Sequence, residues 1–208
     1  MIGNDVVDIA LASKQSNWKR PGFLKKIFTI PEQSCIFNSD NPDVLAWLIW
    51  SMKESAYKIV VQQNHIRFFA PLRFECLIRN CVNNHYSGYV FFENFIFETS
   101  SEYFNMVIFT LARAANYFSS NLYFYEKIKF SNKYYNTQHK EVYLSIFKTL
   151  AKQKGKHLKH FSIKKDAIGI PEIYYSEEKS NISLSLSHHG RYGAYILTEP
   201  ANCFLPPL

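Results

Sequence analysis

The chain has 208 residues, with 24 basic against 17 acidic side chains and a net charge of +7. Hydrophobic residues make up 47% and aromatic residues 17%, enough for a packed core, which excludes a disordered tail, a collagen-like fibre and a disulfide-stapled miniprotein. The basic surplus favours an anionic partner, which includes nucleic acid, a phosphorylated metabolite or an acidic protein.

The four cysteines form no CxxC pair and lack the histidine spacing of a zinc site, so we interpret them as reduced thiols. The first residues show no basic segment followed by an apolar run, which argues against a signal peptide. The densest apolar stretch, residues 44–50, is too short to cross a bilayer. We therefore expect a cytoplasmic protein with no membrane partner.

The first predicted elements are a strand at residues 2–9 and short helical pieces up to Asn38. A long helix follows from Asn41 to about Gln63, because Asn41 is a good N-cap and proline at position 42 fits the first helical position. Apolar residues recur along this helix at three- and four-residue steps and form one buried stripe. The stripe consists of Leu45, Leu48, Met52, Ala56 and Ile59.

Three strands are predicted next, at residues 73–79, 88–98 and 103–112, with turns at 83–84 and 100–101. Residues 116–136 are less regular, polar and rich in tyrosine. A second helix is predicted at 139–153 with Gly155 as its stop, and the remaining strands are predicted at 158–165, 172–175, 182–187 and 193–197.

This order of elements predicts an α+β fold with two lobes, each with a long helix packed on a small antiparallel sheet. We expect a single domain over 1–208, with lobe 1 at about 1–115 and lobe 2 at about 116–208. No sequence repeat accompanies the apparent duplication.

Asp5 is the first candidate ligand. A carboxylate beside Gly3 in an otherwise apolar strand costs stability unless something pairs with it. Side chains alternate between the two faces of a strand, so Asp5 and Asp8 point to opposite faces and a regular strand cannot present both acids on one face. For Asp8, capping of the next helix and a ligand role are equally good interpretations. Taken alone, Asp5 is better interpreted as an ordinary strand-end acid.

Glu54 and Lys58 lie four residues apart on the long helix and therefore share a face, away from the apolar stripe. Spacing alone favours a surface ion pair worth about 0.3–0.5 kcal/mol. The nearby Trp47 and Trp50 weaken that interpretation, because bulky rings on the same side suggest an enclosed site.

The third candidate region is the strand end Ser183–Tyr192, in which Ser and Leu alternate before two histidines, a glycine and an arginine. Hydroxyl, imidazole and guanidinium groups at a strand end can hold a phosphate. A polar strand end with a tight turn is the alternative. His188 and His189 are a poor metal pair, because neighbours on a strand point to opposite faces.

Together, the IGxD strand, the WSxKESxxK helix and the SLSH strand end resemble the 4′-phosphopantetheinyl transferase superfamily. Asp5 lies 49 residues before Glu54, close to the usual interval in that family. Gly169-Ile170-Pro171 is similar to the family's GKP turn, with Ile170 in place of lysine. Asn4 replaces the usual aliphatic residue, and Val7 stands where two-lobed members have a second acid, which puts a three-carboxylate metal site in doubt.

The resemblance covers about residues 1–75 and 165–198 and leaves 76–160 without a motif. The order of motifs resembles that of the small holo-acyl-carrier-protein synthases, whereas the length is nearer that of the two-lobed transferases. Because a helix with a sheet is predicted twice, we expect the site within one chain, in the cleft between its two lobes. A site between the subunits of a trimer, as in the small members, is the alternative.

The resemblance implies transfer of the 4′-phosphopantetheine arm of coenzyme A to a serine of an acidic acyl or peptidyl carrier protein, with release of 3′,5′-ADP. It implies Mg²⁺ held by Asp5 and Glu54, with Glu54 also taking the serine proton, directly or through a metal-bound water. Lys58 would contact the transferring phosphoryl group and Lys53 would help to bind pyrophosphate. The remaining coenzyme A contacts implied are Ser187 and His188 near the 3′-phosphate and Gly169 and Pro171 along the adenine.

Two alternatives belong to other classes. One is a catalytically silent relative that binds coenzyme A or a carrier protein without transfer. The other is a nucleic-acid-binding module, which the sequence disfavours because it has no RNP-like or helix-turn-helix signature. We therefore expect no nucleic-acid partner.

Overall fold

The computed structural model describes residues 1–115, 123–132 and 134–199. The elements of the first lobe are β1 (Ile2–Asp8), α1 (Ile9–Gln15), α2 (Pro21–Ile27), α3 (Ile30–Phe37), α4 (Pro42–Asn64), the 3-10 helix η1 (Pro71–Arg73), β2 (Phe74–Val82), β3 (His85–Phe92), β4 (Phe95–Phe104) and β5 (Val107–Ala114). Those of the second lobe are β6 (Tyr123–Lys129), α5 (Tyr135–Lys154), the 3-10 helix η2 (Leu158–His160), β7 (Phe161–Lys165), β8 (Pro171–Tyr175), β9 (Glu178–His189) and β10 (Tyr192–Thr198).

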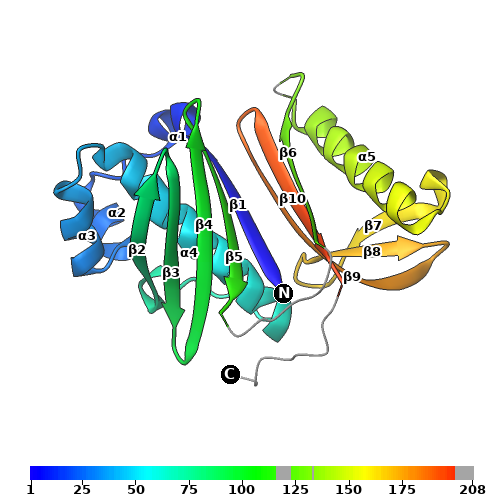
Figure 1. Cartoon of the computed structure of the whole chain (residues 1–208), viewed down its shortest axis with the longest axis horizontal. Coiled ribbons are helices and arrows are strands. Elements are labelled where there is room, and N and C mark those ends of the chain that lie inside the picture. Colours follow the sequence, from blue (N-terminus) through cyan, green and yellow to red (C-terminus); the bar gives the residue numbers. More distant parts are fainter. Residues whose placement is uncertain (116–122, 133, 200–208) are drawn as a thin grey trace.

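Two five-stranded sheets with antiparallel pairings form the two lobes (Figure 1). The strand order is β1-β5-β4-β3-β2 in the first sheet and β6-β10-β9-β8-β7 in the second. α4 packs on the first sheet and α5 on the second. This architecture confirms the predicted α+β class with a long helix on each sheet. Within the described ranges, no helix is long and apolar enough to cross a membrane.

α4 forms where the sequence predicts it. The Asn41 side chain accepts a hydrogen bond from the N–H of Val44 at 3.2 Å, and the helix ends at His65, which adopts the left-handed conformation with φ 52°. The predicted apolar stripe is buried against β1 and β5. Burial of each Leu, Met or Ile of this stripe contributes about 1.5–3 kcal/mol to stability, so the stripe holds α4 firmly on the sheet.

Four strands, rather than the predicted three, connect α4 to the second lobe. The strand predicted at 88–98 is interrupted by a turn at Glu93, which has φ 52°. The strand predicted at 103–112 is interrupted at Asn105 and Met106, where φ is 50° and 63°. Each turn contains one asparagine, Asn94 or Asn105, which favours turns. The prediction passed over this signal because apolar and aromatic residues flank it on both sides.

The turn predicted at 83–84 is correct, since Asn83 and Asn84 have φ of 51° and 63° between β2 and β3. The turn predicted at 100–101 is wrong. Both serines lie inside β4, and Ser101 is buried and hydrogen-bonds Thr110 at 2.9 Å. Serine favours turns, but it also suits a sheet position where a hydroxyl partner is available.

The irregular stretch predicted at 116–136 contains a strand, β6, which pairs with β10; residues 116–122 and 133 lie outside the described part. α5 covers the predicted second helix and ends at Gly155, which has φ 60° as a C-terminal stop requires. One stripe of α5 is buried against the second sheet. That stripe consists of Gln138, Val142, Ile146 and Leu150.

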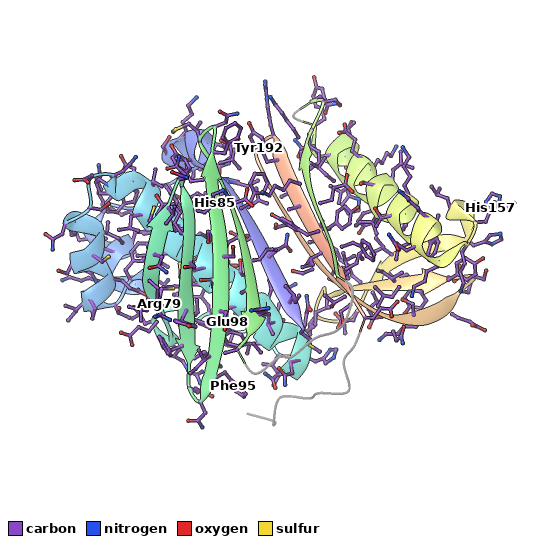
Figure 2. The ribbon with its side chains drawn as sticks, viewed as in Figure 1. Arg79, His85, Phe95, Glu98, His157 and Tyr192 are labelled. Atoms are coloured by element: carbon purple, nitrogen blue, oxygen red, sulfur yellow. The ribbon has the colours of Figure 1, made fainter. Side chains whose placement is uncertain are left out.

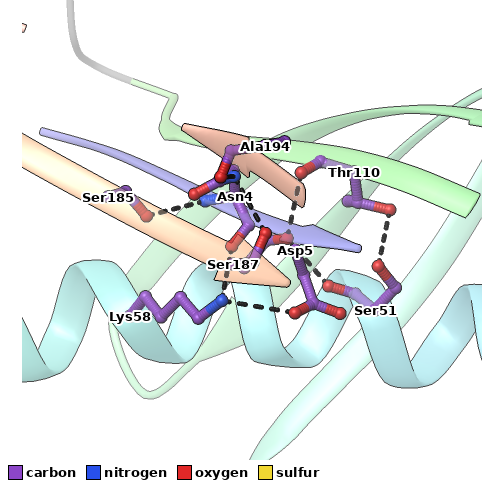
Figure 3. Close-up of polar contacts among 9 residues, drawn as sticks. Asn4, Asp5, Ser51, Lys58, Thr110, Ser185, Ser187 and Ala194 are labelled. Carbon is purple, nitrogen blue, oxygen red and sulfur yellow. Dashed lines mark hydrogen bonds and ion pairs between the residues drawn. The ribbon is translucent and has the colours of Figure 1, made fainter. Parts of the chain in front are cut away.

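β1 joins the two lobes, because it packs on α4 and also contacts β9 and β10. Asn4 is fully buried, and its Nδ2 donates to Ser187 Oγ and to the Ala194 carbonyl, both at 3.0 Å. The Asn4 backbone N–H donates to Ser185 Oγ at 3.1 Å (Figure 3). The departure from the aliphatic residue usual at position 4 therefore has a structural reason: the amide bonds one lobe to the other.

Candidate active site

Asp5 lies on the side of β1 that faces α4. Its Oδ1 is 3.2 Å from Lys58 Nζ, which also donates to the Asn4 carbonyl at 2.7 Å (Figure 3). Gly3 allows this approach, since a Cβ at that position would stand 2.0 Å from the Ser55 carbonyl oxygen. Glycine at position 3 thus brings the carboxylate of β1 against the polar face of the helix.

Glu54 lines the same cleft as Asp5. The pKa of Glu54 is raised to about 7, because burial disfavours its charged form and the negative charge of Asp5 repels it, while Lys58 acts in the opposite direction. The fold therefore brings together the two acids singled out in the sequence. A carboxyl group with a pKa near 7 can both accept and release a proton at neutral pH.

The cleft has a volume of about 320 Å³ and receives side chains from both lobes. Trp47 and Trp50 form part of its wall, as expected from their place beside Glu54. Its remaining side walls come from α1, α2 and the end of β9. Those residues include Ala12, Gln15, Ser16, Phe23, His188 and His189.

His188 lies near basic side chains of both lobes. Its pKa is lowered by burial and then by the charges of His139, Lys58, His189 and Lys165. Two lysines from different lobes, together with neutral imidazole groups that can donate hydrogen bonds, suit a phosphate. The sequence analysis missed His139 and Lys165, because they lie in the region without motifs and at the end of β7.

His189 connects β9 to the start of α1. Its Nδ1 accepts a hydrogen bond from the Asp8 backbone N–H at 3.0 Å, so that nitrogen carries no proton. The other ring nitrogen, Nε2, is 2.9 Å from Gln15 Oε1 and carries the proton it donates. His189 therefore serves as a neutral link between the lobes at the edge of the cleft.

Asp8 caps α1. Its Oδ1 accepts from the Leu11 N–H at 3.2 Å, and its Oδ2 accepts from the Arg191 N–H at 3.5 Å. Gly190, with φ 61°, packs directly against this carboxylate, where a Cβ would lie 2.2 Å from Asp8 Oδ2. Of the two interpretations open for Asp8, the structure supports capping.

Lys53 is placed differently from the expectation that it binds pyrophosphate. Its side chain is 2% exposed, and Nζ is 2.7 Å from Glu32 Oε2, 2.9 Å from the Ile27 carbonyl and 3.0 Å from the Pro71 carbonyl. The ammonium group is thus fully occupied inside the first lobe. A phosphate could reach Nζ only by breaking a buried ion pair, and contact of Lys53 with pyrophosphate stays a prediction.

Ser187 is also turned away from solvent. It is 6% exposed and its hydroxyl accepts from Asn4, so its side chain belongs to the contact between the lobes. Gly169 packs against Arg67, and Pro171 lines a separate hollow of about 210 Å³ near the end of α4, together with Gln62. Contact of Gly169 and Pro171 with adenine stays a prediction.

A larger hollow of about 430 Å³ lies over the face of the first sheet opposite α4. Arg79 and Glu98, which line it, lie on that open face of the sheet (Figure 2). None of the acids or histidines singled out in the sequence lines this hollow, so we place the chemistry in the smaller cleft.

The donor groups of the cleft fit a divalent cation. In the described part of the chain, no group of three or more His, Cys, Asp and Glu side chains could hold a metal ion. Asp5 and Glu54 repel each other, and a cation between them would offset that repulsion. Mg²⁺ commonly takes only one or two protein carboxylates and completes its shell with phosphate and water oxygens, so this pair suits it.

A family model of the 4′-phosphopantetheinyl transferase superfamily matches residues 1–109, more than half of the chain. The chain therefore belongs to this superfamily, and a transferase activity of that kind is supported. The matched region contains β1 and α4, and with them Asp5, Glu54 and Lys58. A search of curated proteins found no match.

Proposed function

We propose that this protein transfers the 4′-phosphopantetheine arm of coenzyme A to a serine of an acyl or peptidyl carrier protein and releases 3′,5′-ADP. The observation that carries the proposal is that the cleft collects Asp5, Glu54 and Lys58 from the first lobe and His188 from the second. Carboxylates for a cation and cations for phosphates are what a reaction at a pyrophosphate requires.

Glu54 acts as the general base. The serine oxygen attacks the phosphorus next to the pantetheine arm, the bond from that phosphorus to the bridging oxygen breaks, and the electron pair leaves with 3′,5′-ADP. The serine proton passes to Glu54, directly or through a water molecule, and burial of this carboxyl group beside Asp5 raises its pKa, which favours proton acceptance. Trp47 and Trp50 limit the access of water to the carboxyl group.

Lys58 of the first lobe and His188 and Lys165 of the second lobe hold the phosphates. Lys58 lies one helical turn from Glu54 and beside Asp5, where it offsets charge on the transferring phosphoryl group. His188, with His139 and Lys165 nearby, binds the phosphate at the nucleotide end. Mg²⁺ held by Asp5 and Glu54 would supply further positive charge against the pyrophosphate.

The carrier protein that we propose as acceptor is acidic. The net charge of +7 would attract such a partner and raise the association rate. This contribution is screened at high ionic strength, so the apparent affinity for the carrier should fall as salt is added.

The test is incubation with coenzyme A, Mg²⁺ and a panel of apo carrier proteins, followed by mass spectrometry of the carrier. The expected product is a carrier heavier by one phosphopantetheine arm. Glu54→Gln should lower the rate by about 10²–10⁴-fold, the usual contribution of a general base, and Lys58→Ala by about 10²-fold or more.

Glu178→Gln is the matched control, because that glutamate is exposed on β9 and should leave the rate unchanged. Retention of full activity by Glu54→Gln would remove Glu54 from the mechanism. Binding of coenzyme A without modification of any carrier would instead identify a catalytically silent relative.

A further inference from the structure

A second surface lies next to Glu54, on the side away from Asp5. Besides the cleft, Glu54 lines a small hollow of about 70 Å³ together with Phe68, Phe69 and Pro71. The Glu54 side chain therefore stands between the cleft and a segment with an exposed aromatic ring. We call residues 26–30 and 66–72 the docking rim.

Lys53 fixes the two parts of the docking rim to each other. Its Nζ donates both to the Ile27 carbonyl at 2.9 Å and to the Pro71 carbonyl at 3.0 Å, so these two segments lie side by side. Glu32 holds the same ammonium at 2.7 Å and also accepts from the Cys76 N–H at 2.8 Å. Because the pair is buried, the rim is a preorganised surface rather than two independent loops.

The rim exposes large apolar side chains. Ile30 is 82% exposed, Ile66 63%, Phe69 62% and Leu72 47%. Lys26 lies over the Phe69 ring, with Nζ 5.1 Å from its centroid, so a cation and an exposed ring are paired at the surface. Exposed apolar side chains grouped beside a reactive group are typical of a protein interaction site.

Basic side chains predominate within the docking rim. The docking rim itself contains no acidic residue, while Lys26 and Arg67 are exposed in it and Lys25 is exposed beside it. Of the acids that border the rim, Glu32 is buried and paired with Lys53, whereas Glu75 is exposed and Glu93 is paired with Arg73. The surface is therefore complementary to an acidic partner that also presents apolar side chains.

We propose that the docking rim binds the acidic acceptor protein and delivers its serine to Glu54 from the side opposite Asp5. This inference rests on the proposed transferase function and adds the location of the protein substrate. The apolar side chains provide the central contact and the lysines orient the partner. Lys53 is a positioning residue in this scheme, because it holds the rim and touches neither substrate.

The test measures steady-state kinetics with coenzyme A and an apo carrier that the wild-type protein modifies. Phe69→Ala and Lys26→Glu should each raise the KM for the carrier by about 10-fold or more, the loss typical of an important interface residue, and leave the KM for coenzyme A unchanged. Both side chains are exposed, so circular dichroism of the variants should match the wild type.

Phe104→Ala and Lys152→Glu are matched controls for ring and charge. Phe104 is 70% exposed at the end of β4 and Lys152 is exposed near the end of α5, and neither belongs to the rim or the cleft. Both controls should leave the two KM values unchanged. Controls that raise the carrier KM as much as Phe69→Ala would overturn the assignment, because the effect would then be nonspecific.

Two other results would also overturn it. One is an unchanged carrier KM in both rim variants while transfer proceeds. The other is loss of binding to phosphatidylglycerol vesicles in those variants with no change in carrier kinetics, which would make the rim a lipid-binding surface. A wild-type protein that modifies no carrier would refute the proposed function itself, and that outcome is distinct from these two.

Discussion

The two lobes share one plan, a five-stranded sheet with a long helix, but they bury their helices differently. α4 has 14 buried residues among its 23, including the polar Ser51, Lys53 and Ser55. α5 buries one stripe on the second sheet, and its other face is open (Figure 1). α4 also contacts α3, so it is covered on more than one side. Covering a helix on several sides gives the first lobe the buried polar positions that a catalytic carboxyl group needs.

The lobes also differ in charge. Residues 1–115 contain eleven basic and ten acidic side chains, whereas residues 116–208 contain thirteen and seven. Nearly all of the positive surplus therefore belongs to the second part of the chain. The first lobe contributes Asp5 and Glu54 to the cleft, and the second contributes His188 with Lys165 nearby. The comparison suggests that catalysis and phosphate binding are divided between the lobes.

The largest expected effect is a loss of stability when a buried lysine of α4 is replaced, compared with the replacement of an exposed lysine of α5. Lys53→Met should lower the free energy of unfolding by about 3–5 kcal/mol, because it leaves Glu32 buried without its cation. Lys154→Met breaks the exposed ion pair with Glu199 and should cost at most about 1 kcal/mol. Urea unfolding of both variants measures the difference, and equal losses would contradict the contrast between the two helices.

A pH effect of about 3 kcal/mol should come from Glu54 alone. Its pKa of about 7 in the folded protein exceeds its ordinary value of 4.5, so between these values the folded state holds a proton that the unfolded chain has lost. The stability conferred by this proton is present below pH 4.5 and lost as the pH rises through 7.

Glu54→Gln removes this dependence. In urea unfolding with EDTA present, the stability of the variant relative to the wild type should increase from pH 4.5 to pH 8. Glu178→Gln, in the second lobe, should show no such trend. A difference between Glu54→Gln and the wild type that stays constant over this range would argue against the raised pKa.

A smaller effect is expected where the lobes meet. Asn4→Ala removes the donor to Ser187 Oγ and to the Ala194 carbonyl and should lower the free energy of unfolding by about 1–3 kcal/mol. Asn38→Ala, which removes an exposed amide bonded to Ser34, is the control and should have little effect. If thermal unfolding shows the same small loss of stability in both variants, the hydrogen bonds of Asn4 do not stabilise the contact between the lobes.

The smallest expected effect tests whether the second lobe binds coenzyme A without binding the carrier. Lys165→Ala should raise the KM for coenzyme A by about 10-fold, equivalent to about 1.4 kcal/mol, and leave the KM for the carrier unchanged. Lys148→Ala, on α5, is the control. A change in carrier KM with no change in coenzyme A KM would place Lys165 on the protein-binding side instead.

The sequence was sufficient where the determining interactions are local. The bounds of α4 follow from the Asn41 cap and the apolar stripe, and the face shared by Glu54 and Lys58 follows from helical spacing alone. The end of α5 at Gly155 and the turn at 83–84 were also predictable, because each depends on a local residue that readily adopts a positive φ. The suggestion that Asp5 and Glu54 meet came from the motif interval, and the geometry of the cleft agrees with it.

Only the tertiary structure distinguished residues that look equivalent in sequence. Lys53 and Lys58 lie on the same helix, yet one is buried with Glu32 and the other lines the site beside Asp5. Asn4 bonds to residues more than 180 positions away, and Lys165 acts on His188 across the sheet. Burial and electrostatics depend on what packs against a side chain, and for these residues the packing partner comes from a distant part of the chain.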